Sequence, residues 1–322
     1  TWVGDDEDKF YLVEGARVPQ LSAEFADVAN MVGAASLNAG TVDWSDYENR
    51  EVNVVVNNAT SKEGGAPYII KTVAQAAADG NPINGTGSPN YYGANHLLDG
   101  GTHVAVLKFQ SLDCKMLGAR GDGVTDDTVA MALATEISKI MRVELLIPPG
   151  VYIINDLEIS NNCRIRGIGY RRQDENASGA VFKATTGAFC CKVFDYRFGR
   201  GVEGYAVKNL KIIGSATTEY GIILVGTDAL VEDLIVDNVP NGVGIKVGYS
   251  WRSSFKDLKV TNCGVGIQFG DAADAQAING AVFTNVNVEL CNVGIYAVKN
   301  NGATQAVANV FNGLVIEGIK LD

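Results

Sequence analysis

"EDLIVD", residues 232–237, is one of five related phrases that decide the fold of this chain. The others are "KNLKII" (208–213), "KDLKVT" (256–261), "TNVNVE" (284–289) and "NGLVIE" (312–317), and the five recur at intervals of 24, 24, 28 and 28 residues. A second series lies out of phase with the first and begins at Gly221, Gly244, Gly266 and Gly294. Two short strands per period of 22–28 residues, each entered through Gly, Asn or Asp, are typical of one coil of a solenoid.

Apolar residues alternate within each phrase, as Leu210 and Ile212 or Leu234 and Val236 do. A strand with one apolar face buries that face against the equivalent strand of the next coil, which is how a parallel β-helix is built. A helical solenoid would need a period of about 3.6 residues, which these phrases lack. The sequence therefore predicts an all-β fold dominated by a parallel β-helix.

A helix is predicted directly before the first coils. In "TDDTVAMALATEISKIM" (125–141), four residues at spacings of four predict one apolar stripe, and Thr125 or Asp126 is placed to cap the helix start. The stripe residues are Val129, Leu133, Ile137 and Met141. We expect this helix to close the N-terminal end of the β-helix, where strand edges would otherwise be unpaired. The glycines and aspartates of "GARGDGVTDDT" (118–128) are interpreted as the joint that leads into it.

The first third of the chain shows no such period. "SAEFADVANMVGAAS" (22–36) predicts a short amphipathic helix, whereas "EVNVVV" (51–56), "APYIIK" (66–71) and "THVAVLKF" (102–109) predict strands. We predict an N-terminal segment with the short helix over 1–40, a small β-rich adaptor domain over 41–112, and the capping helix with the β-helix over 113–322.

Composition restricts the partners of the protein. The formal net charge of -11, with no basic patch, disfavours nucleic acid and anionic membrane surfaces. No apolar run reaches the roughly 18 residues of a membrane helix, so no membrane insertion is predicted. The six cysteines have neither metal-ligand spacing nor the density of a disulfide scaffold, which predicts free and mostly buried thiols.

The joint, helix and solenoid together resemble the pectate-lyase-like superfamily, which includes polygalacturonases, bacteriophage tailspikes and capsule depolymerases. Residues 34–72, from "AASLNAG" to "GGAPYIIKT", are similar to the small domain that precedes the β-helix in many phage tailspikes. The likeness covers most of residues 30–170. It implies a right-handed parallel β-helix, a homotrimer, attachment to phage tail or baseplate proteins through the N-terminal region, and a place in the virion after synthesis in the host cytoplasm.

The chain also departs from that family. Polygalacturonases use a histidine on later coils, but His96 and His103 both precede the predicted helix. The solenoid ends at "VIEGIKLD" with neither a closing helix nor a polar cap, so we expect the natural protein to continue past Asp322.

Candidate catalytic residues come from stacked outward positions. The residue after each phrase's second apolar residue gives one column, which reads Ile213, Asp237, Thr261, Glu289 and Glu317. Glycosidases need two carboxyl groups about 5–5.5 Å apart for retention or roughly 6.5–9.5 Å apart for inversion. Glu289 and Glu317 would be one coil apart and Asp237 and Glu289 two coils apart, at about 4.8 Å per coil. The alternative is that these are solvated surface carboxylates.

Substrate-binding candidates lie on the same face and at a corner. Lys259, together with Lys211 and Asn287 in the same column, is placed to bind an acidic sugar. Trp251 and Arg252 are candidates for a stacking platform and an anion clamp, although a loop Trp packed against a neighbouring chain fits equally well. Asp271 and Asp274 are too few ligands for a convincing Ca²⁺ site, so no cofactor is predicted and Ca²⁺ stays a weak alternative.

These residues lead to three functional hypotheses. The first is a phage tailspike that binds and depolymerises a bacterial surface polysaccharide, either capsule or lipopolysaccharide, by hydrolysis or β-elimination. The second is a non-enzymatic adaptor that anchors the receptor-binding part of a spike or fibre to the virion. The third is a cellular pectinase-like hydrolase or lyase.

Overall fold

The computed structural model describes residues 2–4, 10–12, 23–27, 43–56, 64–79, 95–98, 101–109, 111–160, 162–169, 179–194, 204–270, 278–298 and 309–318. The chain divides into two compact units, Thr1–Phe109 and Gln110–Asp322.

Unit 1 is built on a five-stranded sheet with the order β3-β4-β5-β7-β6. Its strands are β3 (Ala23–Asp27), β4 (Glu51–Val56), β5 (Gly64–Thr72), β6 (His96–Leu98) and β7 (His103–Leu107). The unit also contains β1 (Trp2–Gly4), β2 (Phe10–Leu12), the 3-10 helix η2 (Trp44–Tyr47) and α2 (Val73–Ala78), which begins at a capping box formed by Thr72 and Gln75. The strands predicted in 51–56, 66–71 and 102–109 are confirmed as β4, β5 and β7.

The helix predicted over 22–36 is wrong where the structure describes it. Residues Ala23–Asp27 are extended and pair in parallel with β4, with Ala23 opposite Val52 and Phe25 opposite Val54. The edge of β4 offers these residues partners for their backbone hydrogen-bonding groups, and such tertiary pairing overrides a weak helical preference. Residues 28–36 of that prediction lie outside the described residues.

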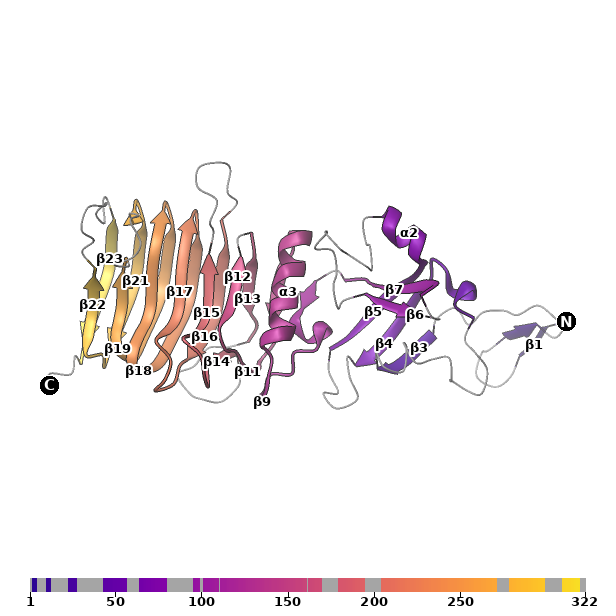
Figure 1. Cartoon of the computed structure of the whole chain (residues 1–322), viewed down its shortest axis with the longest axis horizontal. Helices are drawn as coiled ribbons and strands as arrows, with labels where there is room; N and C mark the ends of the chain where they lie inside the picture. Colours follow the sequence, from indigo (N-terminus) through magenta and orange to yellow (C-terminus); the bar gives the residue numbers. More distant parts are fainter. Residues whose placement is uncertain are drawn as a thin grey trace. The chain divides into compact units, whose positions relative to one another are not determined.

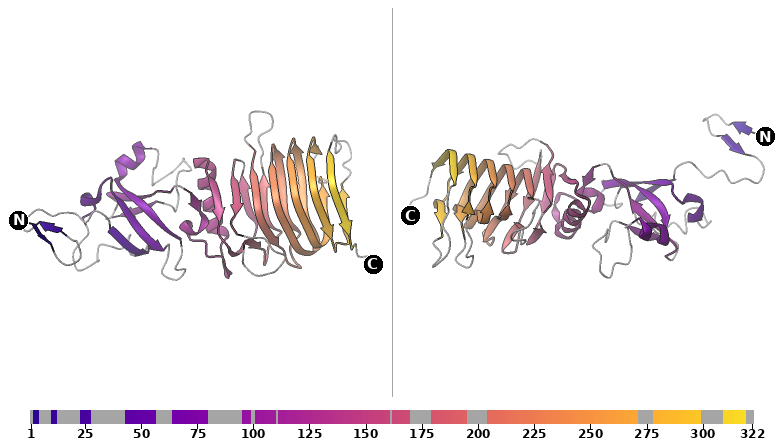
Figure 2. Two further views of the ribbon diagram at one scale, coloured as in Figure 1. Left: turned by 180° about the vertical axis from the view of Figure 1, so that it is seen from behind. Right: turned by 90° about the horizontal axis from the view of Figure 1, so that it is seen from above.

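Unit 2 is a parallel β-helix, as predicted (Figures 1 and 2). Each coil contributes strands to three faces. Face 1 contains β8 (Leu112–Asp113), β10 (Glu144–Ile147), β13 (Arg164–Gly167) and the first half of β16 (Ala206–Ile213). Face 2 contains β9 (Asp122–Asp126), β11 (Gly150–Ile153), β14 (Ala180–Lys183) and the second half of β16. Face 3 contains β12 (Leu157–Ser160), β15 (Phe189–Phe194) and β17 (Tyr220–Thr227).

The later strands continue these faces. The long strands β18 (Leu230–Trp251) and β19 (Ser254–Phe269) run through all three faces, and β21 (Val282–Glu289) and β23 (Val310–Glu317) run through faces 1 and 2. β22 (Val293–Ala297) lies on face 3, and the short β20 (Ile278–Asn279) pairs with the end of β18.

The register follows the repeat found in the sequence. Leu210, Leu234, Leu258, Val286 and Leu314 pair in succession, at the same 24- and 28-residue intervals. The first four of them are at most 2% exposed, whereas Leu314 in β23 is 38% exposed. Aromatic rings stack in the same way, since the centroids of Phe255 and Phe283 are 4.6 Å apart and those of Phe283 and Phe311 are 4.7 Å apart. The core of unit 2 is therefore a set of columns parallel to the axis.

Left-handed residues turn the chain at the corners between faces. The corner between faces 1 and 2 uses Asn209, Asp233, Asp257, Asn285 and Gly313, all with positive φ. These residue types adopt the left-handed region more readily than others do. The corners after faces 2 and 3 contain two exceptions, Leu290 (φ 53°) and Arg252 (φ 51°).

The capping helix is α3 (Thr128–Met141), but its buried stripe differs from the predicted one. Val129 is 83% exposed and Met141 is 41% exposed, while the buried side chains are those of Met131, Ala134, Thr135, Ile137 and Ser138. At about 100° per residue, a spacing of four drifts by about 40° at each step, so a row of four such residues moves off one face. The i, i+3, i+4, i+7 set from Met131 to Ser138 stays on one face.

The joint before α3 is organised around Asp127. Its buried carboxylate accepts hydrogen bonds from the backbone N–H groups of Arg120 (2.7 Å) and Gly121 (3.0 Å), and Asp126 accepts one from the N–H of Thr128 at 2.9 Å. Gly121 has φ 65°, and a Cβ there would lie 2.7 Å from the ring of Tyr152. The interpretation of this stretch as an architectural joint is supported by these contacts.

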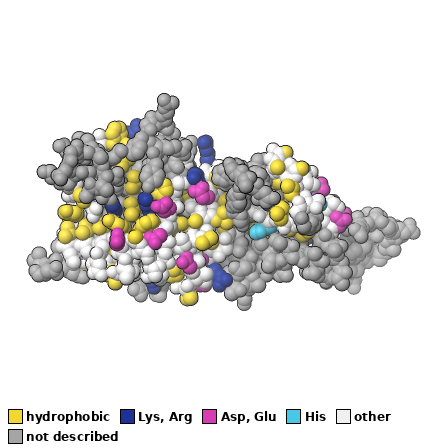
Figure 3. Space-filling view, viewed as in Figure 1, with side chains coloured by type: hydrophobic (Ala, Val, Ile, Leu, Met, Phe, Trp, Pro, Cys, Tyr) yellow, Lys and Arg dark blue, Asp and Glu magenta, His cyan; other side chains and the backbone are white. Residues whose placement is uncertain are grey.

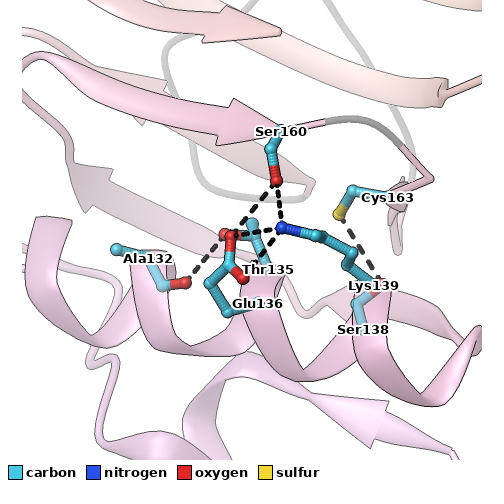
Figure 4. Close-up of polar contacts among 7 residues, drawn as sticks. All are labelled: Ala132, Thr135, Glu136, Ser138, Lys139, Ser160 and Cys163. Carbon is cyan, nitrogen blue, oxygen red and sulfur yellow. Dashed lines mark hydrogen bonds and ion pairs between the residues drawn. The ribbon is translucent and has the colours of Figure 1, made fainter. Parts of the chain in front are cut away.

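A polar cluster ties α3 to the first coil (Figure 4). Lys139 Nζ donates to Ser160 Oγ at 2.7 Å and forms an ion pair with Glu136 at 3.1 Å, and Ser160 Oγ donates to Glu136 at 3.2 Å. Glu136 and Lys139 come from the helix and Ser160 from the end of β12, so the cluster fixes the helix on the coil.

Candidate functional site

The predicted column of outward residues exists on face 2. Ile213 pairs with Asp237, Asp237 with Thr261, Thr261 with Glu289, and Glu289 with Glu317. A second column two residues earlier contains Lys211, Ile235, Lys259, Asn287 and Val315 in the same succession. The structure thus brings the three candidate acids and Lys259 together on one face.

Asp237 is held by two partners from different coils. Lys211 Nζ, from the coil below, lies 3.7 Å from Asp237 Oδ2, and Asn262 Nδ2, from the corner above, donates to Asp237 Oδ1 at 3.0 Å. The Lys211 side chain is 5% exposed and that of Asp237 is 23% exposed. A buried lysine needs such a partner, because an uncompensated charge there would be costly.

Glu289 has an analogous set of partners. Lys259 Nζ, from the coil below, lies 2.9 Å from Glu289 Oε2, and Asn287 Nδ2 on the same strand donates to Glu289 Oε1. Both charged side chains are 21% exposed. Each of these two carboxylates therefore has one lysine on one oxygen and one amide on the other.

Glu317 is in a different setting. It follows Glu289 by one coil, and its residue is exposed. The position from which a lysine would reach it is occupied by Asn287, whose amide already donates to Glu289. The Glu289 and Glu317 pair therefore combines a carboxylate held by Lys259 with a solvent-exposed one, at a strand separation of about 4.8 Å.

Trp251 and Arg252 lie at the corner where face 3 leads into face 1. Trp251 is 44% exposed, and its ring centroid is 6.2 Å from that of Tyr249. Arg252 Nη2 lies 2.7 Å from Asp228 Oδ2, one coil below. These residues come from a different corner than the face 2 acids, so they form a separate candidate contact area and are not part of the carboxylate column.

Face 1 carries a comparable row of charges. Glu232 lies 3.6 Å from Lys208 and 2.9 Å from Lys256, and the hydrogen bond from Lys256 is the main cause of its lowered pKa, assisted by Lys208. Acidic and basic side chains are neighbours among hydrophobic ones on the part of unit 2 seen in Figure 3. Ion pairing between coils is thus a general feature of this β-helix. Amide partners add to the ion pairs of Asp237 and Glu289 on face 2, and Asp257 at the corner between faces 1 and 2 likewise has Lys256 on one oxygen and the Asn285 amide on the other.

The described residues offer no nucleophilic thiol and no metal site. All six cysteines are free and buried, as predicted, and burial raises the pKa of Cys163 to about 12. No group of three or more His, Cys, Asp or Glu side chains in the described ranges is arranged to hold a metal ion. Asp271 and Asp274 lie outside those ranges. Among the same residues, no helix is long and apolar enough to cross a membrane.

One partner in the site was missed by sequence reasoning. Asn262 follows the predicted column by one residue, and its left-handed backbone (φ 55°) turns its amide onto Asp237 of the coil below. The sequence contains a signal for this partner, because Asn238 and Asn262 occupy equivalent corner positions of the repeat. The alternating apolar residues and the candidate acids both lie on the faces, so neither pattern draws attention to residues at these corners.

Comparison with known proteins gives a shared fold. No protein-family model matches the chain. The non-secreted LysM effector LysM19 of Penicillium expansum is 40% identical over 75 residues, which are 23% of this chain and 6% of that protein. The tailspike protein gp49 of Acinetobacter baumannii bacteriophage Fri1, a capsular polysaccharide depolymerase, superposes with a TM-score of 0.52 at 14% identity, covering 91% of this chain. Tailspike protein 2 of bacteriophage CBA120 gives a TM-score of 0.43 at 14% identity over 92% of this chain.

The chain spans 54% and 52% of the lengths of these two tailspike structures. At such low identity the likeness to the Fri1 tailspike shows the fold alone. The predicted all-β architecture is confirmed, and it is the parallel β-helix fold found in phage tailspikes.

Proposed function

We propose that this protein binds a bacterial surface polysaccharide, capsule or lipopolysaccharide, along face 2 of its β-helix and cleaves it while a phage adsorbs to its host. The observation that carries the proposal is the column of Asp237, Glu289 and Glu317, which lie in register on one partly exposed face. The fold that the chain shares with the Fri1 tailspike supports the substrate class.

Cleavage would use two of the three acids. Glu289 and Glu317, one coil apart, suit a retaining hydrolase, in which one carboxylate is the nucleophile and the other is the general acid. Glu289 is the better nucleophile, because Lys259 and Asn287 fix its position, and Glu317 would then protonate the leaving oxygen. Asp237 and Glu289, two coils apart at about 9.6 Å between strands, are close to the spacing of an inverting pair.

The assembly and location belong to the same proposal. A homotrimer in a phage tail, attached to tail or baseplate proteins through unit 1, would present several weak glycan sites at once. Linked weak sites hold a polymer much more firmly than one site does. Trp251 and Arg252, at the corner between faces 3 and 1, would form a second glycan contact separate from the column on face 2.

A non-enzymatic adaptor or binding protein is the second candidate. It is favoured by the ion pairs of Asp237 and Glu289, because a general acid in a glycosidase lies in surroundings that keep it protonated. Neither of these two acids is in such apolar surroundings.

The test is the viscosity of capsule and lipopolysaccharide preparations treated with the purified chain. Loss of viscosity that disappears in Glu289→Gln and Glu317→Gln, but persists in the face 1 control Glu232→Gln, supports an enzyme with this column as its active site. Absorbance of unsaturated uronate among the products would select a lyase. Unchanged viscosity with retained glycan binding would favour the adaptor, and full activity of both variants would remove the column from the mechanism.

A further inference from the structure

Face 2 repeats one arrangement of side chains two coils apart. We call it a station and define it as a carboxylate with a lysine on one oxygen and an amide on the other. The lower station is Asp237 with Lys211 and Asn262, and the upper station is Glu289 with Lys259 and Asn287. Two acids of different length, in different coils, thus have the same kinds of partner.

Each station carries no net charge. The lysine of each station is compensated by its own carboxylate, at 3.7 Å in the lower station and 2.9 Å in the upper one. Lys211 is 5% exposed and therefore offers little surface to a ligand. An anionic sugar placed here would meet a carboxylate at each station, on a chain whose formal net charge is -11. The lysines do not make face 2 a site for acidic sugars.

The stations are well supplied with short-range donors and acceptors. A lysine donates, a carboxylate accepts, and the side chains of Lys259 and Glu289 in the upper station are each 21% exposed. A sugar hydroxyl both donates and accepts, so two adjacent hydroxyls match the Glu289 carboxylate and the Lys259 ammonium beside it. At the lower station, where Lys211 is buried, they match the Asp237 carboxylate and the Asn262 amide. Hydrogen bonds to charged groups are the stronger ones, which makes an ion pair a good site for a neutral diol.

The distance between the stations fits an extended glycan. Asp237 and Glu289 are two strands apart, about 9.6 Å along the axis. One coil rise is close to the length that one pyranose ring adds to an extended chain, so the stations meet every second sugar. Thr261, a small hydroxyl residue, lies between them in the column, and Ile235, an apolar residue suited to the C–H face of a ring, lies beside Asp237 on the same strand.

We infer that face 2 takes an uncharged polysaccharide lying along the β-helix axis, in which adjacent hydroxyls on every second sugar bind the Asp237 and Glu289 stations. This inference rests on the proposed polysaccharide-binding function and specifies the chemical class of the ligand. It replaces the expectation that Lys211 and Lys259 bind an acidic sugar.

The test uses the direction in which one substitution changes affinity. The whole chain is run by affinity electrophoresis in gels containing a neutral polymer (galactomannan, dextran or glucomannan) or an acidic one (polygalacturonate or alginate). Glu289→Gln removes an acceptor for a diol and also frees the charge of Lys259. We expect binding to a neutral polymer to weaken about tenfold or more, the range for a lost hydrogen bond to a charged group. Glu144→Gln on face 1, where the acid is paired with Arg166, is the matched control and should leave retardation unchanged.

Salt gives a second readout that a structural role of Glu289 would not move. Binding of the wild-type chain to the neutral polymer should survive high salt, because no net charge is being neutralised. Retardation by the acidic polymers alone, abolished by salt and strengthened in Glu289→Gln, would overturn the inference while leaving polysaccharide binding intact. Failure to bind any of these polymers, with no change in the viscosity of capsule preparations, would overturn the proposed function as well.

Discussion

Replacing Arg252 by Asn should stabilise the β-helix. Arg252 turns the corner after face 3 with φ 51°, where the equivalent residues one coil below and above are Asp228 and Gly280, with φ 52° and 65°. A left-handed backbone costs an ordinary residue roughly 1–2 kcal/mol, and Asn is among the few that tolerate it. The substitution should therefore recover about 1 kcal/mol of backbone free energy.

The ion pair with Asp228 works against this gain. It is short, at 2.7 Å, but the side chains of Arg252 and Asp228 are 73% and 40% exposed. Exposed pairs of this kind contribute roughly 0.2–1 kcal/mol. The net effect of Arg252→Asn is then a small increase in the free energy of unfolding, about 0.5 kcal/mol. In a chain that already carries Asp228→Asn the pair is absent, and the full backbone gain of about 1 kcal/mol should appear.

Urea unfolding followed by circular dichroism measures both quantities, with the transition of the β-helix fitted separately from that of unit 1. The comparison of Asp228→Asn with the double variant isolates the backbone contribution, because Asn also tolerates the corner at 228. A fall in stability in the double variant would refute the argument from the left-handed corner. Arg252 is also a predicted glycan contact, so Arg252→Asn should weaken polysaccharide binding; unchanged affinity would remove Arg252 from the site.

Two further predictions concern the scaffold. Gly266→Ala should lower the free energy of unfolding by about 2–3 kcal/mol, measured by urea titration. The new methyl group would press against Val288 Cγ1 and lie 2.6 Å from the carbonyl oxygen of Gly294. A variant as stable as the wild type would show that the coils adjust freely. Asp127→Ala should lower the free energy of unfolding by about 2–3 kcal/mol, because it leaves the N–H groups of Arg120 and Gly121 unpaired. A urea midpoint equal to that of the wild type would contradict this role of Asp127. Burial raises the pKa of Asp127, so its contribution to stability is most favourable below the unfolded value near 3.9 and declines as pH rises through the folded value. Thermal melts of the wild type and Asp127→Ala across that range isolate this contribution, because the other carboxylates are common to both: the difference in melting temperature should narrow as pH rises.

The architecture of unit 2 can be predicted from the sequence because each position in the repeat corresponds to one place on a coil. A strand has a side-chain period of two, so a known interval between Leu234 and Leu258 also fixes which residues stack outside them. For this reason the sequence predicts the column of Asp237, Thr261 and Glu289, and the strand register confirms it. No such repeat restrains residues 23–27, where pairing with a distant strand decided the structure.

The partners of the acids were beyond this kind of inference. Lys259 and Glu289 are two positions apart in the repeat and one coil apart in space, so their contact is diagonal across the face. The columns predict what stacks directly above what, and they led to lysines free to bind an acidic sugar. Diagonal contacts depend on side-chain length and direction, which the period of the backbone does not specify.

The amides favour a site on face 2 over one on face 1, because both acids of the face 2 column have one. The same arrangement recurs at the corner between the two faces, where Asp257 has Lys256 on one oxygen and the amide of Asn285 on the other. On face 1, Glu232 is shared by Lys208 and Lys256, its side chain is 32% exposed, and such a row is sufficiently explained as a solvated ladder of ion pairs. On face 2, the single lysine on each acid already balances the charge, so the amides of Asn262 and Asn287 are not needed for neutrality. Their effect is to fix the second carboxylate oxygen, which restricts the carboxylate to one orientation. Orientation matters little to a solvated surface charge, but it is what recognition of a sugar or attack on one requires.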